Sequence, residues 1–238
     1  IKKDADIAHI PIIVVTALNS QEDRVRSLKA GADDFVTKPI NDKALTLRMK
    51  SLIRIKQMTD EWKLRSSSMK EIEGEDGENV YSPINIKIDE AKVLMLDDDV
   101  IQMKKIGKFL EDQGINFVPA PTTKEAINHL QNEQFDLMIV STVLDNEDGL
   151  RFCSKLRAEE ELASMPVMIL VDQADSITLN KGLEIGLTDY IVTPIEVNEF
   201  FVRVQSQIKR KRFQESIQST ISESVSASVI DPLTQLYN

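Results

Sequence analysis

"GADDFVTKPI" at residues 31–40 and "GLTDYIVTPI" at residues 186–195 are two versions of one stretch, separated by 155 residues (186 minus 31). Each version starts with glycine, passes through an aspartate into apolar residues, and ends in Pro-Ile. An apolar run bounded by glycine and proline predicts a buried strand followed by a turn. The versions differ at a cationic position, where Lys38 faces Thr193. This difference indicates that the two copies differ in chemistry.

The match continues on both sides of this stretch without a gap. Residues 9–17 ("HIPIIVVTA") align with 164–172 ("SMPVMILVD"), and residues 47–56 align with 202–211. Self-similarity over such a span predicts two homologous units. At the same offset, the first three strands of the first unit would lie before residue 1. We therefore expect the first unit to be incomplete and the sequence to be a piece of a longer protein.

The second unit contains five apolar runs that alternate with five helical patterns. The expected strands lie within residues 91–99, 115–120, 135–141, 166–171 and 189–193. Few polar residues interrupt these runs, which is typical of a parallel sheet covered by helices on both faces. One helix begins with Thr122 and Glu125 at capping-box spacing. We predict an α/β fold with a doubly wound, five-stranded parallel sheet, in one partial and one complete copy, joined and followed by long helices.

Composition along the chain divides it into five segments. The acidic, glycine-containing run "EIEGEDGEN" between the units predicts a flexible linker. In order, we expect the C-terminal part of the first unit, the linker, the second unit, a long helix and the start of a further domain. These segments are placed at residues 1–65, 66–90, 91–212, 213–230 and 231–238.

The overall composition excludes several classes of protein. A net charge of -10 argues against nucleic-acid binding, because phosphate contacts need clustered lysine and arginine. No apolar stretch is long enough to span a membrane, and no signal peptide opens the sequence. Cys153 is the single cysteine, so no intrachain disulfide forms, and its amphipathic surroundings predict a buried structural thiol. We expect a soluble cytoplasmic protein.

The residues that could carry chemistry lie where strands end, because ligands of open parallel sheets bind at the carboxyl ends of the strands. In the first unit these positions hold Thr16 and Lys38. In the second unit they hold Asp97, Asp98, Ser141, Val171 and Thr193.

Four ordered stretches resemble the receiver domains of bacterial two-component response regulators. These are "VLMLDDD", "FDLMIVSTVLDNEDGL", "PIIVVTA" and "DDFVTKP", and together they cover nearly the whole chain. The resemblance implies a flavodoxin-like sheet in the order 2-1-3-4-5. It also implies an aspartate at the end of the third strand that accepts a phosphoryl group, with Mg²⁺ held by that aspartate and an acidic pair. A lysine and a hydroxyl then bind the phosphoryl oxygens, and an aromatic residue on the fifth strand rotates.

In the first unit, this resemblance gives Thr16 the role of the hydroxyl, Lys38 that of the cation and Phe35 that of the aromatic residue. The acceptor would lie before residue 1, so Mg²⁺ is expected only in a complete first receiver. The alternative is that Thr16 and Lys38 are an ordinary pair of residues at strand ends.

The second unit departs from the receiver pattern at three positions. Ser141 stands where the acceptor aspartate belongs, Val171 replaces the hydroxyl and Thr193 replaces the lysine. Serine forms no acyl phosphate, and a buried lysine without an anion would be an uncompensated charge. We predict a pseudo-receiver that acts as an interaction surface and holds no metal. The first alternative is a functional Mg²⁺ site at Asp97 and Asp98.

A second alternative assigns the acceptor role to Asp145 or Asp148 in the second unit. It is less favoured, because "EDG" resembles the loop that follows the acceptor in receivers.

The last segment has an apolar stripe with a spacing of four residues. It comprises Phe213, Ile217, Ile221, Val225 and Val229. Serine and β-branched residues fill the rest of the segment and are poor helix formers, so the helix needs a partner along its stripe. We favour a dimer stalk over packing of this helix on its own receiver.

The final residues, "DPLTQLYN" (231–238), begin with an N-cap acid and a first-turn proline and resemble the opening of a GGDEF diguanylate cyclase domain. The whole arrangement resembles the PleD-type response regulators. That resemblance implies a homodimer through receiver surfaces and the C-terminal helix, an upstream histidine kinase or phosphotransfer protein, and synthesis of cyclic di-GMP from GTP by the missing domain, which would also bind Mg²⁺. The chain itself should be no enzyme and hold no cofactor. The alternative is a non-enzymatic tandem-receiver adaptor that acts by protein docking.

Overall fold

The computed structural model describes most of the second unit and parts of the first. The described residues are 7, 10–17, 26–27, 30–40, 42–43, 45–46, 48–50, 52–53, 56–57, 60, 86–145, 147–172 and 176–229. The predicted linker up to residue 85 and the predicted domain start at 231–238 lie outside them. Below, unit one means the described residues up to 60, and unit two means residues 86–212.

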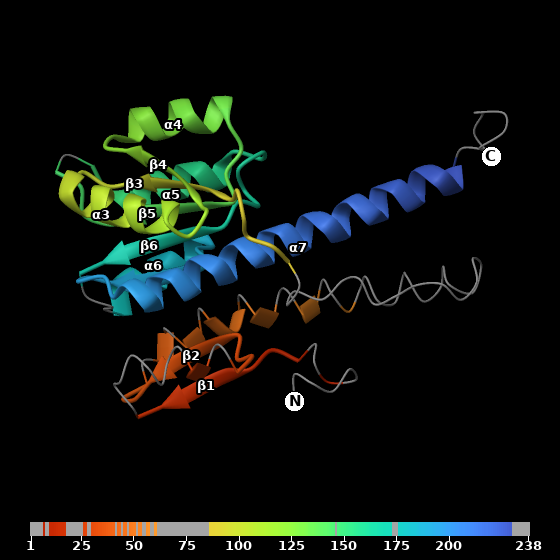
Figure 1. The fold of residues 1–238 in the computed structure, drawn as a ribbon, viewed down its shortest axis with the longest axis horizontal. Helices are drawn as coiled ribbons and strands as arrows, with labels where there is room; N and C mark the ends of the chain where they lie inside the picture. Colours follow the sequence, from red (N-terminus) through yellow and green to blue (C-terminus); the bar gives the residue numbers. More distant parts are fainter. Residues whose placement is uncertain are drawn as a thin grey trace.

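Unit one contains two parallel strands, β1 (Ile13–Thr16) and β2 (Asp34–Thr37). Figure 1 shows this small sheet beside the larger one of unit two. Val15 of β1 is 43% exposed, whereas Leu170, its counterpart in the repeat, is 2% exposed. The counterpart of β1 in unit two lies between two neighbouring strands of its sheet. Among the described residues, β1 pairs only with β2.

Unit two contains a complete parallel sheet. Its strands are β3 (Lys92–Leu96), β4 (Asn116–Ala120), β5 (Leu137–Ser141), β6 (Val167–Val171) and β7 (Asp189–Val192). They lie in the order β4-β3-β5-β6-β7, and every neighbouring pair is parallel. The predicted α/β class and the 2-1-3-4-5 strand order are therefore confirmed.

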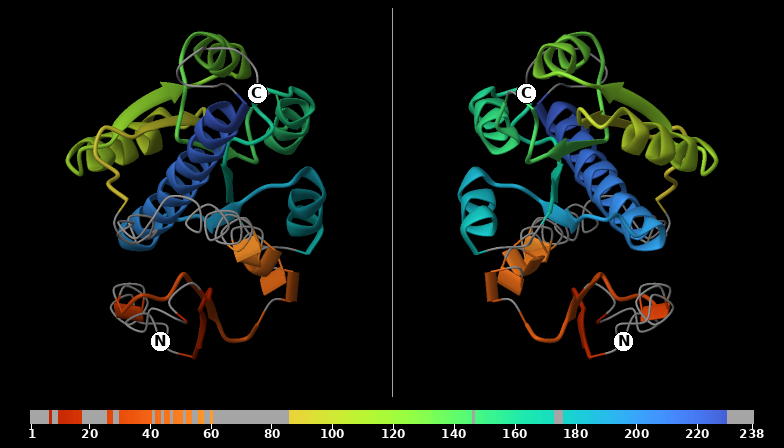
Figure 2. Two further views of the ribbon diagram at one scale, coloured as in Figure 1. Left: turned by 90° about the vertical axis from the view of Figure 1, so that its right-hand side faces the viewer. Right: turned by 90° about the vertical axis from the view of Figure 1, so that its left-hand side faces the viewer.

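Helices cover both faces of this sheet (Figure 2). They are α3 (Val100–Glu111), α4 (Thr123–Asn132), α5 (Gly149–Ala158), α6 (Ser176–Ile185) and α7 (Val197–Val229). One buried cluster joins α4 and α5 to the sheet, and the other joins α3 and α7 to the opposite face. Each fully buried aliphatic or aromatic side chain contributes about 1.5–3 kcal/mol, so two continuous cores account for a fold with two layers of helices.

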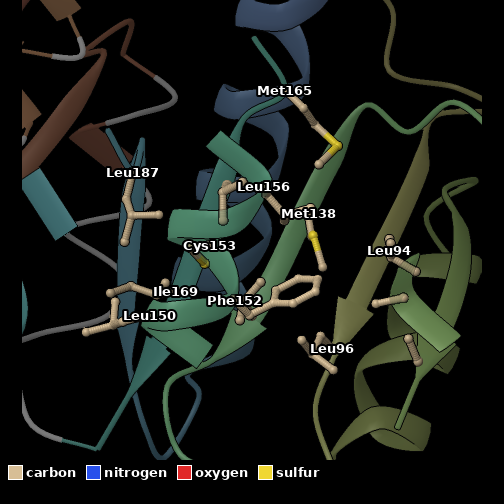
Figure 3. Packing of buried hydrophobic residues seen from close by; sticks show 14 of the residues in the cluster. Leu94, Leu96, Met138, Leu150, Phe152, Cys153, Leu156, Met165, Ile169 and Leu187 are labelled. Carbon is tan, nitrogen blue, oxygen red and sulfur yellow. The ribbon is translucent and has the colours of Figure 1, made fainter. Parts of the chain in front are cut away.

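Figure 3 shows the cluster under α5, where Phe152 and Leu156 pack near Met138 of β5. Cys153 belongs to this cluster and is 1% exposed. Burial raises the pKa of its thiol to about 12, so the thiolate is absent at neutral pH. The predicted structural thiol is confirmed.

Local signals in the sequence set the ends of the helices. The Thr122 hydroxyl accepts a hydrogen bond from the Glu125 N–H at 3.2 Å, which confirms the predicted cap of α4. Asp148 caps α5 in the same way, accepting from the N–H groups of Leu150 and Arg151. A Cβ on Gly149 would lie 1.9 Å from the carbonyl oxygen of Ser141. This close approach explains the glycine of the "EDG" loop.

Helix α7 is the longest element, with 33 residues and no interruption up to Val229. It packs on unit two and continues beyond it (Figure 1). Phe213, the first residue of the predicted apolar stripe, is 1% exposed, so the stripe begins inside the chain's own packing. Within the described residues, no helix combines the length and apolarity needed to cross a membrane.

Candidate functional site

The predicted site residues of unit two meet at one edge of its sheet, because the carboxyl ends of parallel strands coincide there. Thr193 follows β7, and its N–H donates to the carbonyl oxygen of Val171 at the end of β6, at 2.9 Å. Asp97 and Asp98 follow β3, and Ser141 ends β5, the strand between β3 and β6. The fold therefore gathers these residues at the sheet edge where the receiver resemblance predicts the phosphoryl-binding pocket.

Hydrogen bonds within the pocket already occupy the carboxylate of Asp97. This side chain is buried, and Gln102 Nε2 donates to its Oδ2 at 2.7 Å while the Asp99 N–H donates to its Oδ1 at 3.1 Å. Burial raises the pKa of Asp97, and the bonds from Gln102 and Asp99 oppose that shift. Both oxygens thus face N–H donors rather than a cation.

The other residues of this pocket also have structural partners. Ser141 Oγ donates to the carbonyl oxygen of Val143 at 2.9 Å, and Asp98 accepts a short hydrogen bond from the Asp145 N–H. Across the described part of the chain, no three or more His, Cys, Asp or Glu side chains are grouped to hold a metal ion. Mg²⁺ is usually held by one or two carboxylates together with waters and phosphate oxygens. In unit two Ser141 supplies no carboxylate, and Asp97 and Asp98 already accept hydrogen bonds that fasten the surrounding loops. The expectation that unit two holds no metal stays a prediction.

A carboxylate that the sequence analysis did not identify lies beside Thr193, the residue that replaces the lysine. Thr193 Oγ1 donates to Asp172 Oδ1 at 2.7 Å. The counterpart of Asp172 in unit one is Ala17 (172 minus 155). An anion next to the strand end repels an incoming phosphoryl group. Asp172 therefore disfavours phosphoryl binding in addition to the absence of the lysine. The aligned stretches contained the signal, in the pairing of Ala17 with Asp172.

The predicted residues of unit one occupy the matching positions. Thr16 ends β1 and Lys38 follows β2, and the Lys38 N–H donates to the Thr16 carbonyl oxygen at 2.8 Å. These two residues thus lie at the same sheet edge. Phe35 lies farther back on β2 and is 2% exposed. The structure places all three as expected, and their roles in sensing a phosphoryl group stay predictions.

Four buried charged residues join the two units, and we call them the reciprocal cluster. They are Asp34, Arg48, Asp189 and Arg203, with exposures of 6%, 4%, 3% and 3%. Arg48 Nη1 donates to Asp34 Oδ1 at 2.8 Å and lies 3.3 Å from Asp189 Oδ1. Arg203 Nη1 lies 3.1 Å from Asp34 Oδ1 and 3.2 Å from Asp189 Oδ2. Each arginine therefore bridges both aspartates.

Two aromatic rings complete this contact. The Cζ of Arg203 lies 4.8 Å from the centroid of the Phe35 ring, and the Cζ of Arg48 lies 4.8 Å from that of Tyr190. A guanidinium over an aromatic face is attracted by about 0.5–2 kcal/mol, more when water is excluded. Tyr190 is the counterpart of Phe35 and Arg203 that of Arg48, each 155 residues later, so the contact has an internal pseudo-two-fold symmetry. Unit two thus touches the aromatic residue to which a switching role was assigned.

Arg48 and Asp189 shift each other's pKa in this cluster. Burial alone would lower the pKa of the Arg48 guanidinium, yet Asp34 and Asp189 more than reverse this effect and its pKa lies above the ordinary value. Burial raises the pKa of Asp189 to about 6, with Arg48 opposing the shift. Removing one member of such a set leaves a buried charge uncompensated, which typically costs about 3–5 kcal/mol.

The sequence analysis did not predict this cluster. The repeat aligned Asp34 with Asp189 and Arg48 with Arg203, but no feature of either copy alone indicates that they meet. A usable signal was present: charged residues at core-facing positions of both copies require partners of opposite charge.

Comparisons with known proteins agree with this geometry. The family model described as "Response regulator receiver domain" matches residues 1–50 and 93–205. The response regulator PleD of Caulobacter vibrioides is 34% identical over 240 residues, covering 100% of this chain and 51% of that protein. A probable transcriptional regulator ycf27 of Cyanophora paradoxa is 30% identical over 125 residues, covering 52% of this chain and 51% of that protein. The chain thus spans about half the length of these relatives.

Among solved structures, a two-component response regulator from Clostridium difficile is 25% identical with a TM-score of 0.48, covering 51% of this chain and 98% of that one. The chemotaxis response regulator CheY4 of Vibrio cholerae is 23% identical with a TM-score of 0.47, covering 50% and 98%. The chain belongs to the response regulator receiver family, and it is similar to the response regulator PleD along its entire length.

Proposed function

We propose that the chain is the regulatory region of a response regulator that controls a diguanylate cyclase. In this proposal unit one is the receiver that responds to phosphorylation, and unit two is a docking partner that takes up no phosphoryl group. The observation that carries the proposal is the reciprocal cluster, in which Arg203 of unit two contacts both Asp34 and Phe35 of unit one.

The proposed route of the signal starts at the strand ends of unit one. In a complete receiver, the Thr16 hydroxyl and the Lys38 ammonium would bind oxygens of a phosphoryl group, whose charge is about -1.5 to -2. A shift in this edge of the sheet would move Phe35, which β2 carries three residues before Lys38. Because Phe35 lies under the Arg203 guanidinium, its displacement would change the free energy of docking between the units.

Unit two has no comparable input. Gln102, Asp172 and Val143 satisfy the polar groups of its pocket from within the unit. Internal pairing favours a single conformation of this edge, which suits a rigid docking partner. The same bonds and the missing carboxylate support the proposal that unit two binds no Mg²⁺.

The output of the protein is proposed from its resemblance to PleD and from the tail "DPLTQLYN". We place the protein in the cytoplasm, with an upstream histidine kinase or phosphotransfer protein as the phosphate donor. Helix α7 would join two copies as a homodimer and bring their cyclase domains together. Finding a GGDEF motif encoded after Asn238 would support this output. Finding a different output domain there would favour an adaptor that acts by docking alone.

The first prediction concerns the pocket of unit two. Incubation of the chain with acetyl phosphate and Mg²⁺ should leave its intact mass unchanged, because Ser141 cannot form an acyl phosphate. A variant with Ser141→Asp, Val171→Thr, Thr193→Lys and Asp172→Ala restores the receiver's residue types and should gain one phosphoryl group. A phosphoryl adduct on the unmodified unit two would contradict the proposal.

The second prediction concerns the interface. Arg203→Ala should destabilise the chain by about 3–5 kcal/mol in urea unfolding, because it leaves a buried carboxylate unpaired. In a double-mutant cycle with Asp34→Ala, the two losses should fall short of additivity by about 1–3 kcal/mol. Arg151→Ala, on the exposed surface of α5, is the matched control and should change stability by less than about 0.5 kcal/mol. Additive losses would show that the two units are not in contact through this pair.

The third prediction concerns the two pockets in the full-length protein. Lys38→Ala should lower phosphorylation-dependent cyclase activity about 10-fold or more, because a charge-assisted hydrogen bond contributes about 1.5–3 kcal/mol. Thr193→Ala should leave activation close to the wild-type level. Equal losses from both substitutions would mean that the two pockets share one role.

A further inference from the structure

The reciprocal cluster is symmetric in its four charges and two rings, but not in what holds its arginines. Arg203 Nε and Nη2 donate to Glu199 Oε1 at 3.0 and 2.8 Å, one turn earlier on α7. The counterpart of Glu199 in unit one is Ala44 (199 minus 155). Arg203 therefore has a carboxylate four residues before it, and Arg48 does not.

This carboxylate fixes the direction in which Arg203 points. Two of its nitrogens are engaged by Glu199, and the third, Nη1, lies within 3.2 Å of both aspartates. The side chain of Glu199 is 20% exposed and that of Arg203 is 3% exposed. An arginine already held in its bound geometry loses less conformational freedom on docking. Unit two thus presents a preorganised cation to Asp34 and Phe35.

Charge alone does not distinguish the two units. Unit one contributes Asp34 and Arg48, and unit two contributes Asp189, Arg203 and Glu199, with Arg210 of α7 as a further cation that acts on Asp189. Arg48 is the charged group that most lowers the pKa of Asp189, ahead of Arg210. What distinguishes unit two is therefore the carboxylate that holds its arginine in place.

We propose that Glu199 is a positioning residue that fixes Arg203 of unit two for docking on unit one. It holds Arg203 toward Asp34 and Phe35, so unit two docks with an arginine that is already in its bound geometry. This inference rests on the proposed docking role of unit two and adds the residue that positions the docking cation.

Moving the carboxylate from one unit to the other tests this inference in the chain itself. The readout is hydrogen-exchange protection of the Phe35 and Tyr190 amides, which donate to Asp34 and Asp189 at 2.7 and 2.8 Å and report opening of the interface. Glu199→Ala should lower this protection about 10-fold, the loss expected for hydrogen bonds between charged groups. Ala44→Glu alone should not lower it, because the added carboxylate would hold Arg48 as Glu199 holds Arg203.

The double variant Ala44→Glu/Glu199→Ala has the same composition of charges as the wild type. The repeat predicts that the transferred carboxylate anchors Arg48 as Glu199 anchors Arg203, so protection should return to within about 3-fold of the wild-type value. A purely structural role of Glu199 in α7 would give no such recovery. Protection in the double variant no better than in Glu199→Ala, or unchanged protection in Glu199→Ala, overturns the inference.

Glu199→Gln separates the two contributions of this side chain, since it keeps a hydrogen-bond acceptor and removes the charge. Protection should fall below the wild-type value but remain above that of Glu199→Ala, and protection equal to the wild type would overturn the charge argument. The outcome is distinguishable from failure of the proposed function. If the cycle between Arg203 and Asp34 shows no coupling, docking itself is wrong, whereas coupling without recovery in the double variant removes only the role of Glu199.

Discussion

Two arginines shared between two buried aspartates hold the receiver units against each other. Charges removed from water are costly unless they are paired and hydrogen-bonded, so this arrangement is stable only when Asp34, Arg48, Asp189 and Arg203 are all present and both units are docked. The contact is therefore sensitive to small displacements of either unit. Its placement beside Phe35 connects that sensitivity to the strand edge where Thr16 and Lys38 lie.

The residues at the strand ends of unit two fit the proposed docking role. Thr193 stands where the receiver resemblance places a lysine, and it donates to Asp172. Asp97 and Asp98 accept hydrogen bonds from the start of α3 and from the loop after β5, so they stabilise the scaffold. Arg203 and Asp189 lie on the face toward unit one.

Local pattern and apolar burial predicted the parallel strands, the cap at Thr122 and the buried Cys153, whereas the sheet order followed from the receiver resemblance. The sequence also placed Ser141, Val171 and Thr193 at one edge, since strand ends follow from the sheet. Asp172, Gln102 and the reciprocal cluster were missed. Gln102 lies only five residues from its partner Asp97, whereas Asp172 and Thr193 are 21 residues apart and Arg203 and Asp34 are 169 apart, so no local rule pairs the last two sets. The repeat aligned these residues but could not show that the copies face each other.

Docking of the two units requires contact between specific side chains in solution. Nuclear Overhauser spectroscopy of the isotope-labelled chain measures this contact directly. Cross-peaks are predicted between the Arg203 side chain and the Phe35 ring, and between the Arg48 side chain and the Tyr190 ring, since each guanidinium carbon lies 4.8 Å from the centroid of its ring. Absence of both cross-peaks, with the contacts inside unit two intact, would contradict docking through the reciprocal cluster.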